Sequence, residues 1–242
     1  MKKVIILATA AIAVGAAAPA VAADLPARTY TKAPAMVPSP IYDWSGFYIG
    51  INGGGATSRN CWDLLGGSPE GCHDATGGTV GGQIGYRWQM SSWVFGVEAQ
   101  GNWADLQGDN LSLDPGSVGN QNRTRIDAFG LFTGQIGYAW NNALIYVKGG
   151  AAVTDNQYDV FFPAGGALID SASETRWGAA VGVGVEYAFA PNWSLGFEYN
   201  HLFMGGNDVI FASTAADHIN QDVDLFLARV NYKFGGPMTA RY

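Results

Sequence analysis

The stretch Thr-Arg-Trp-Gly-Ala-Ala-Val-Gly-Val-Gly-Val-Glu-Tyr-Ala-Phe, residues 175–189, decides the fold class. Its side chains alternate between a bulky apolar set and a small or charged set. The bulky set is Trp177, Ala179, Val181, Val183, Val185, Tyr187 and Phe189, and the other set is Gly178, Ala180, Gly182, Gly184, Glu186 and Ala188. Successive side chains of a β-strand point to opposite faces, so the pattern predicts a strand with one bulky apolar face.

Similar alternation recurs along the chain and predicts an all-β protein of eight antiparallel strands. The expected strands are Gly46–Thr57, Thr79–Gln89, Trp93–Trp103, Ile126–Trp140, Ala143–Thr154, Thr175–Phe189, Trp193–Met204 and Val223–Phe234. Each is long enough to cross a lipid bilayer, which takes about 9–11 tilted residues. An even number of strands places both ends of an up-and-down barrel on one side.

The connections between these strands alternate between short and long. Gln89–Ser92, Asn141-Asn142 and Ala190-Pro191-Asn192 are tight, with turn-forming Asn and Pro. The other connections are expected to be long polar loops, namely Ser58–Gly78, Ala104–Thr124, Asp155–Glu174 and Gly205–Asp222. Short turns at one end and long loops at the other are typical of an outer-membrane barrel, whose turns face the periplasm.

The apolar face of these strands would point outward in a membrane barrel and inward in a soluble barrel. The opposite face mixes glycine with charged residues, which suits a narrow interior better than the bulky set does. Aromatic residues also gather where the strands meet the short turns, as in an interfacial girdle. The predicted girdle is Trp88, Trp93, Tyr138, Trp140, Tyr187, Phe189, Trp193, Tyr232 and Phe234. We therefore predict an eight-stranded transmembrane β-barrel.

The first 22 residues have the pattern of a cleaved secretory signal peptide. Two lysines are followed by an Ala-rich apolar run and by small residues before the bond between Ala22 and Ala23. A membrane-anchoring helix is the alternative, but a Pro-rich stretch follows at once. No run of about 18 apolar residues occurs beyond this segment. The expected organisation is a signal peptide at 1–22, a Pro-rich periplasmic linker at 23–44, a barrel at 45–234 and a C-terminal extension at 235–242.

Composition and motifs exclude several classes of function. The net charge is −7, with 13 basic and 20 acidic residues, so the basic surface that nucleic acid requires is missing. The chain lacks a nucleotide-binding glycine motif, a G-x-S-x-G motif and His spacing suited to zinc, and we predict no enzyme activity, cofactor or metal. A surface hydrolase would need loop residues such as His201, Ser213 and Asp217 to converge. The other two histidines, His73 and His218, also fall in or near the expected loops.

Cys61 and Cys72 are the only cysteines and lie in the first expected loop. In an exported protein such an isolated pair indicates a disulfide closing that loop, although two free thiols remain the alternative. The bridge should stiffen one loop without being needed for the barrel.

Charged residues on the inward face predict a lumen charge layer. Its members are Arg87, Glu98, Lys148, Glu186, Glu198, Arg229 and Lys233, with Arg87 and Lys233 nearest the short turns. An eight-stranded barrel is only wide enough for side chains to fill. Opposite charges are therefore expected to pair and plug the interior, and the alternative is a wet pore without specific pairing.

Four segments resemble the alphaproteobacterial outer-membrane immunogenic protein family. They are Ala23-Asp24-Leu25-Pro26, Trp44-Ser45-Gly46-Phe47-Tyr48-Ile49-Gly50, Gln135-Ile136-Gly137-Tyr138-Ala139-Trp140 and Val230-Asn231-Tyr232-Lys233-Phe234. The resemblance implies a small porin-like barrel related to the outer-membrane protein A barrel and the opacity proteins. Such barrels often end on an aromatic residue that serves as an assembly signal. Here Phe234 is followed by eight more residues, and the sequence leaves Phe234 and Tyr242 as alternative signals.

Two functions of different classes follow from these features. One is a structural or porin-like role in the cell envelope, and the other is a surface interaction module acting through the long loops. The expected loops hold most of the acidic residues and should favour cations over anions. Apolar pairs in them, Phe161-Phe162 and Ile210-Phe211, could contact a ligand or extend the strands. Expected partners are outer-membrane lipid, lipopolysaccharide and the barrel-assembly machinery but not nucleic acid, and the sequence does not identify an extracellular ligand.

Overall fold

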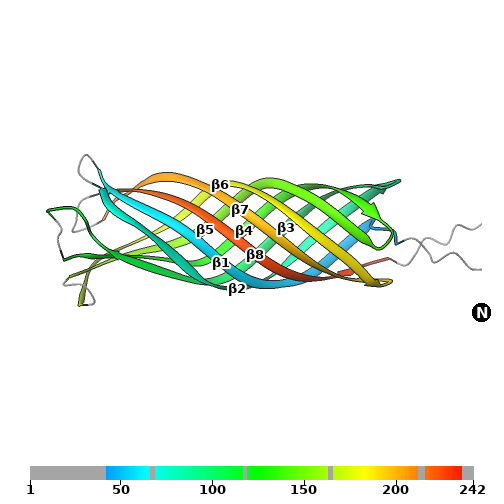
Figure 1. The fold of residues 1–242 in the computed structure, drawn as a ribbon, viewed down its shortest axis with the longest axis horizontal. Helices are drawn as coiled ribbons and strands as arrows, with labels where there is room; N and C mark the ends of the chain where they lie inside the picture. The colour runs from blue at the N-terminus through cyan, green and yellow to red at the C-terminus, as the bar shows by residue number, and fades with distance from the viewer. Residues whose placement is uncertain (1–41, 66–68, 117–118, 163–165, 212–215, 236–242) are drawn as a thin grey trace, which may run out of the picture. The chain divides into compact units, whose positions relative to one another are not determined.

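The computed structural model describes residues 42–65, 69–116, 119–162, 166–211 and 216–235. Within them, eight antiparallel strands close into a single ring in which each strand pairs with its sequence neighbours and the last pairs with the first (Figure 1). The strands are β1 Gly46–Leu64, β2 Pro69–Met90, β3 Trp93–Leu111, β4 Gln121–Trp140, β5 Ala143–Phe162, β6 Ala167–Ala190, β7 Trp193–Val209 and β8 Asp217–Lys233. The predicted all-β, eight-stranded, up-and-down barrel is confirmed.

The two ends of the barrel differ in their connections. At one end, here called the turn end, two-residue turns join β2 to β3, β4 to β5 and β6 to β7. Ser91 and Asn141 in these turns adopt positive φ angles of 58° and 53°. Asn tolerates this left-handed conformation better than most residues do. The described chain begins and ends at the turn end, and the opposite end is called the loop end (Figure 1).

The loop-end connections are much shorter than predicted. Of the expected loop Ser58–Gly78, all but a few residues belong to β1 and β2, which stay paired from Ser58 opposite Ala75 to Trp62 opposite Gly71. The prediction of four loops of about twenty residues was therefore wrong. The expected loop segments are rich in Gly, Asn and Asp, which are typical of loops. Inward and outward side chains nevertheless still alternate there, since Asn60 and Trp62 are buried and Arg59 is exposed.

The outward face carries an apolar band. All nine residues of the predicted girdle are on this face near the turn end, and Trp140 is 76% exposed. Several of the aromatic rings pair across neighbouring strands, such as Trp93 with Tyr138 at 5.6 Å between centroids. The band continues toward the loop end through residues that include Ile51, Val80, Trp103, Trp177, Val181, Phe203 and Phe226. Among the described residues no helix is long and apolar enough to cross a membrane.

The inward face is built in layers, which can be followed along β8 from the turn end. Lys233, Asn231 and Arg229 come first, then Leu227, Leu225 and Val223, then Gln221, Ile219 and Asp217, and all nine are buried. The apolar part of this series belongs to a cluster inside the barrel, here called the apolar layer. It comprises Ala56, Ala75, Leu106, Ile126, Phe129, Leu131, Ala152, Ala180, Leu202, Met204, Val223, Leu225 and Leu227.

The apolar layer was not predicted from the sequence, which suggested an interior of glycine and charge only. Two register shifts help to build it, one between Trp103 and Leu106 and one between Ile126 and Ala128. Both lie beside Asp127, where an irregularity changes the parity of β4 while β3 and β5 keep theirs. Ile126 thereby faces inward although simple alternation from the turn end places it outward, whereas Leu106 keeps the inward parity of Glu98 and Asn102.

Candidate functional site

A cluster of four charged side chains, here called the central ion cluster, crosses the barrel interior. Arg229 of β8 donates hydrogen bonds to Glu98 of β3 through Nη2 and to Glu198 of β7 through Nη1. Lys148 Nζ of β5 lies 3.2 Å from Glu98 Oε1 and 2.5 Å from Glu198 Oε1. Each of the four side chains is at most 2% exposed. Two cations and two carboxylates therefore neutralise one another in a site without access to solvent.

Two tyrosines complete this cluster. Tyr48 of β1 donates to Glu98 Oε2 at 2.6 Å, and Tyr146 of β5 donates to Glu198 Oε2 at 2.6 Å. Sequence reasoning missed both tyrosines because aromatic residues were assigned to the outward face. Tyr48 is four residues from the inward Asn52 on β1, and Tyr146 is two residues from the inward Lys148 on β5. An even spacing places both tyrosines on the inward face, and this was the signal that could have identified them.

A separate ion pair lies on the turn-end side of the central ion cluster. Arg87 of β2 binds Glu186 of β6 through two hydrogen bonds, of 3.1 Å and 2.8 Å. Ser194 and Asn231 also donate to Glu186 Oε1. The Arg87 guanidinium lies over the Tyr48 ring, 4.4 Å from its centroid. A buried charge is tolerated only when it is paired and hydrogen-bonded, and both members of this pair meet that condition.

Lys233 does not join either group, although the sequence placed it in the same layer. Its Nζ donates to the backbone carbonyl of Asp43 and lies 4.6 Å from the centroid of the Tyr42 ring. The seven residues of the predicted lumen charge layer are thus all buried, but they divide into a four-residue cluster, one ion pair and one isolated lysine.

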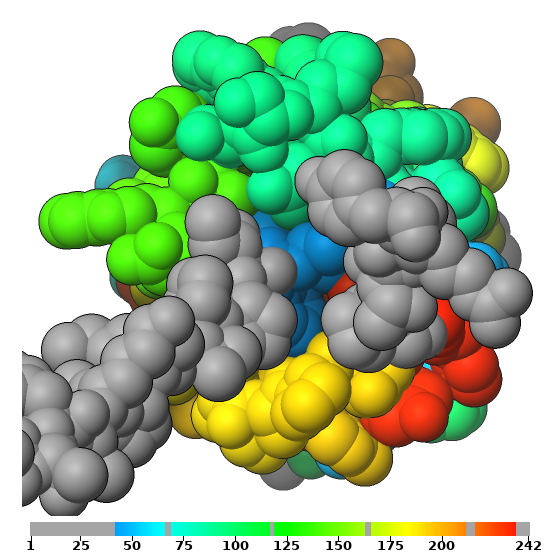
Figure 2. Space-filling model, turned by 90° about the vertical axis from the view of Figure 1, so that its right-hand side faces the viewer, coloured from blue at the N-terminus to red at the C-terminus, as the bar shows by residue number. Residues whose placement is uncertain are grey.

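The turn-end mouth contains the segment that precedes β1. Trp44 is 2% exposed and Tyr42 is 8% exposed, and both pack with Val94, Leu144 and Tyr146. The backbone nitrogen of Trp44 donates to Gln89 Oε1 at 2.7 Å. Figure 2 shows the blue start of the described chain in the centre of the ring of strands. The expected linker at 23–44 therefore ends inside the barrel, because its last residues are aromatic and have an interior to fill.

Between the central ion cluster and the apolar layer lie side-chain amides. Asn52, Gln83 and Asn102 form a chain in which Asn102 donates to Asn52 at 2.6 Å and Asn52 donates to Gln83 at 2.7 Å. Gln83 in turn donates to Asn231 at 2.7 Å. The hydrogen bonds among these amides satisfy the polar groups that are buried next to the ions. The apolar layer beyond them offers no side-chain hydrogen-bonding groups to water.

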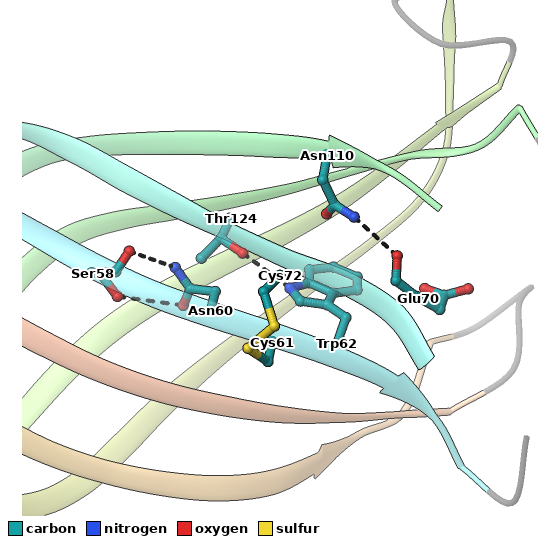
Figure 3. Close-up of a disulfide and its surroundings, with 8 residues drawn as sticks. All are labelled: Ser58, Asn60, Cys61, Trp62, Glu70, Cys72, Asn110 and Thr124. Atoms are coloured by element: carbon teal, nitrogen blue, oxygen red, sulfur yellow. Dashed lines mark hydrogen bonds between the residues drawn. A yellow bond between two sulfur atoms is a disulfide. The ribbon is translucent and has the colours of Figure 1, made fainter. Parts of the chain in front are cut away.

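A second apolar cluster, here called the loop-end cap, lies at the loop end of the interior. It comprises Trp62, Tyr158, Val160, Val209, Phe211 and Ile219. Trp62 is fully buried, and its indole nitrogen donates to Thr124 Oγ1 at 3.2 Å (Figure 3). Thr124 also contacts His73 Nε2 at 3.0 Å, and burial lowers the pKa of His73. Of the apolar pairs noted in the sequence, Phe161-Phe162 ends β5, while Phe211 joins the cap and Ile210 is 80% exposed.

Cys61 and Cys72 form the predicted disulfide. They are directly opposed residues of β1 and β2 near the loop end, so the bridge clamps two paired strands and does not close an irregular loop (Figure 3). Their side chains are on the outward face, opposite the neighbouring Trp62.

Reduction of this disulfide should leave the barrel folded. The seven other strand pairs and the interior layers are independent of the bridge, and a bridge that closes a short loop contributes about 2 kcal/mol to the free energy of unfolding. We expect unheated protein to keep its folded gel mobility in reductant and to unfold at a lower urea concentration. A Cys61→Ala, Cys72→Ala double variant should match the reduced protein and be insensitive to reductant. Loss of the folded band on reduction would contradict this expectation.

Of the residues considered for catalysis, the two that the structure describes do not converge. His201 of β7 faces outward and contacts Asp224 Oδ1 at 2.7 Å, whereas Asp217 of β8 faces inward. Ser213 lies outside the described residues. His218 also faces outward and contacts Asp208 at 2.6 Å. In the described part of the chain, no group of three or more His, Cys, Asp or Glu side chains is arranged to hold a metal ion.

Comparison with known proteins gives matches that extend over almost the whole chain. A family model described as outer membrane protein beta-barrel domain matches residues 6–234. The 31 kDa outer-membrane immunogenic proteins of Brucella melitensis and Brucella suis are each 32% identical over 252 residues, covering 97% of this chain and 100% of the relative. The solved outer membrane protein OprG from Pseudomonas aeruginosa is 18% identical, with coverage of 79% of this chain and 97% of that chain and a TM-score of 0.47.

The closed ring of eight strands, the outward apolar band, the family model and the Brucella relatives agree with the family resemblance seen in the sequence. The apolar band is consequently the surface that the membrane lipid covers. The chain belongs to the outer membrane protein β-barrel family and is an integral outer-membrane protein similar to the Brucella 31 kDa outer-membrane immunogenic proteins.

Proposed function

We propose that this protein is a closed structural barrel of the outer membrane, which stabilises the envelope without forming a steady pore. In this proposal the turn end and both chain ends face the periplasm, and the loop end faces outward. The lipid and lipopolysaccharide of the outer membrane are its surroundings, and the barrel-assembly machinery inserts it. The alternative of a conducting porin requires a continuous polar path through the interior.

The observation that carries the proposal is the filling of the barrel cross-section by Arg229 and its partners. This arginine spans from β8 to carboxylates on β3 and β7, and Lys148 joins the same two carboxylates from β5. An ion that passed through would have to displace partners that are paired in a dry site. The apolar layer and the segment at Tyr42–Trp44 are two further closures in series.

Conductance of the refolded protein in a planar bilayer tests this proposal. We expect no steady current above the bare membrane at either polarity, because each of the three closures alone excludes hydrated ions. Insertion should be verified separately, by protease protection and folded gel mobility of the same preparation. A stable ohmic conductance from verified, folded barrels would contradict the proposal and favour the porin-like role.

A second candidate function is surface interaction through the loop end. The strands continue past the apolar band, and their outward faces carry arginines that each lie between two aspartates on neighbouring strands. Arg59 is opposite Asp74 and Asp222, and Arg123 is opposite Asp109 and Asp159. Each of these arginines is outnumbered by its two neighbouring aspartates. Further carboxylates such as Asp63 and Asp155 add to the negative charge of the loop-end surface. Such a rigid acidic rim favours a cationic partner.

A further inference from the structure

Asp217 is a buried carboxylate at the loop end, and no cation among the described residues forms an ion pair with it. It is the first residue of β8, faces inward between Leu64 of β1 and Val209 of β7, and is 4% exposed. Its Oδ1 atom has no hydrogen-bond partner among the described residues. A carboxylate buried without a donor strongly disfavours its ionised form.

The charged and titratable groups around Asp217 do not offer it a cation. Glu70 of β2 is a charged group that acts on it, and this carboxylate accepts hydrogen bonds from Ser112 Oγ at 3.2 Å and Asn122 Nδ2 at 2.6 Å. Arg176 of β6 is bound to Glu174 at 2.9 Å. Other titratable groups at the loop end are His73 on β2, Asp114 after β3, Tyr158 on β5 and Asp170 on β6 inside, and Asp63, Asp208 and His218 outside.

Both features of this environment act in the same direction. Burial, reinforced by the negative charge of Glu70, raises the pKa of Asp217 to about 7. Asp217 is next to the loop-end cap, because Val209 and Ile219 flank it on β7 and β8 and both belong to the cap. A backbone hydrogen bond of 2.9 Å, from Leu65 N to Ala216 O, joins the residue after β1 to the residue before Asp217.

We propose that Asp217 is a proton-controlled latch, which closes the loop-end cap when protonated and releases it when ionised. The protonated side chain fits among Val209, Ile219 and Leu64 without a counter-charge. The ionised side chain is stabilised only where it reaches water, which requires the β8 start to move away from β1.

The direction of the pH effect follows from linkage. The folded cap holds a proton that an open, solvated Asp217 would lose at its ordinary pKa of 3.8, so the closed form is most stable below about pH 4. Its stability falls as the pH rises from there to about 7 and is constant above that value. The latch is therefore closed in acidic surroundings and loosened near neutral pH.

Amide hydrogen exchange of the refolded full-length protein in detergent micelles tests the latch. Peptides spanning residues 60–65 and 216–221 should be followed from pH 5 to pH 8 and corrected for intrinsic exchange. We expect their exchange to rise by at least about tenfold over this range, because ionisation of the open form drives opening. Turn-end amides of the same sample should show no corrected rise. Absence of a rise in the loop-end peptides of the parent protein would overturn the proposal.

Two variants identify the responsible group. Asp217→Asn has the size of the protonated side chain and cannot ionise, so its cap should stay closed and its corrected exchange should be flat with pH. Asp63→Asn removes a neighbouring carboxylate on the outward face and should keep the pH profile of the parent. A profile in Asp217→Asn that equals the parent's would also overturn the proposal.

Discussion

The Arg229→Ala variant should lose about 3–5 kcal/mol of the free energy of unfolding, because it leaves Glu98 and Glu198 buried with only Lys148 to balance them. Arg229 is 2% exposed and donates to both carboxylates and contacts Tyr146. Urea unfolding of the protein in lipid vesicles, followed by tryptophan fluorescence, measures the loss. Conductance should remain absent, since the apolar layer and the turn-end segment still close the barrel.

Two further variants separate pairing from bulk in this cluster. Arg125→Ala removes an exposed arginine that binds Asp127 at 2.7 Å, and an exposed pair contributes only about 0–1 kcal/mol. Adding Glu98→Gln to Arg229→Met removes the uncompensated charge, leaves Lys148 paired with Glu198 and should recover much of the stability. If Arg229→Ala were as stable as the parent, the paired interior described here would not exist in solution.

The Trp44→Ala variant should lose about 3–5 kcal/mol, as is usual when a buried aromatic side chain is truncated in a packed interior. Trp44 fills the turn-end mouth beside Tyr42 and lies 5.6 Å from the Arg87 guanidinium. Its removal admits water to that pair from the turn end. The same unfolding measurement reports the loss, and the folded gel band of the unheated sample shows whether the barrel still closes.

Trp44→Phe is the matched control for this prediction. The indole nitrogen has no hydrogen-bond partner among the described residues, so only part of the ring volume is lost. A conservative apolar replacement of this kind usually changes stability by less than about 1.5 kcal/mol. Equal stability of the parent and Trp44→Ala would mean that the segment before β1 does not dock in the barrel.

The membrane-spanning part of the fold was predictable because its physics is regular. In residues 175–189 strict alternation assigns every side chain to the correct face, and the tight turns at Asn141-Asn142 and Pro191-Asn192 fix where the strands reverse. The residues that pair across the lumen could be named as charges of inward parity. Which partners meet could not be predicted, because pairing depends on the register around the whole ring.

The loop-end half was predicted poorly for identifiable reasons. Register shifts near Asp127 and Gly205 reverse the parity of β4 and β7, and no local pattern predicts them. Segments such as Asn60–Leu64 mix polar and aromatic residues, so they resembled loops although Trp62 is an interior side chain. For the same reason the sequence did not single out Asp217 as an unpaired group. Its Oδ1 atom lacks a hydrogen-bond partner among the described residues, and a sequence alone cannot show such a lack.

The layered interior also carries information about how the strands align. A slip of one strand by two residues keeps every side chain on its own face, so the outward apolar pattern cannot detect it. The interior can, since a slip of β8 by two residues would put Leu227 or Asn231 in the place of Arg229 and leave Glu98 and Glu198 without its guanidinium. The ionic, amide and apolar layers of the interior thus specify the strand register. They destabilise misaligned barrels whose outward apolar face would still suit the lipid.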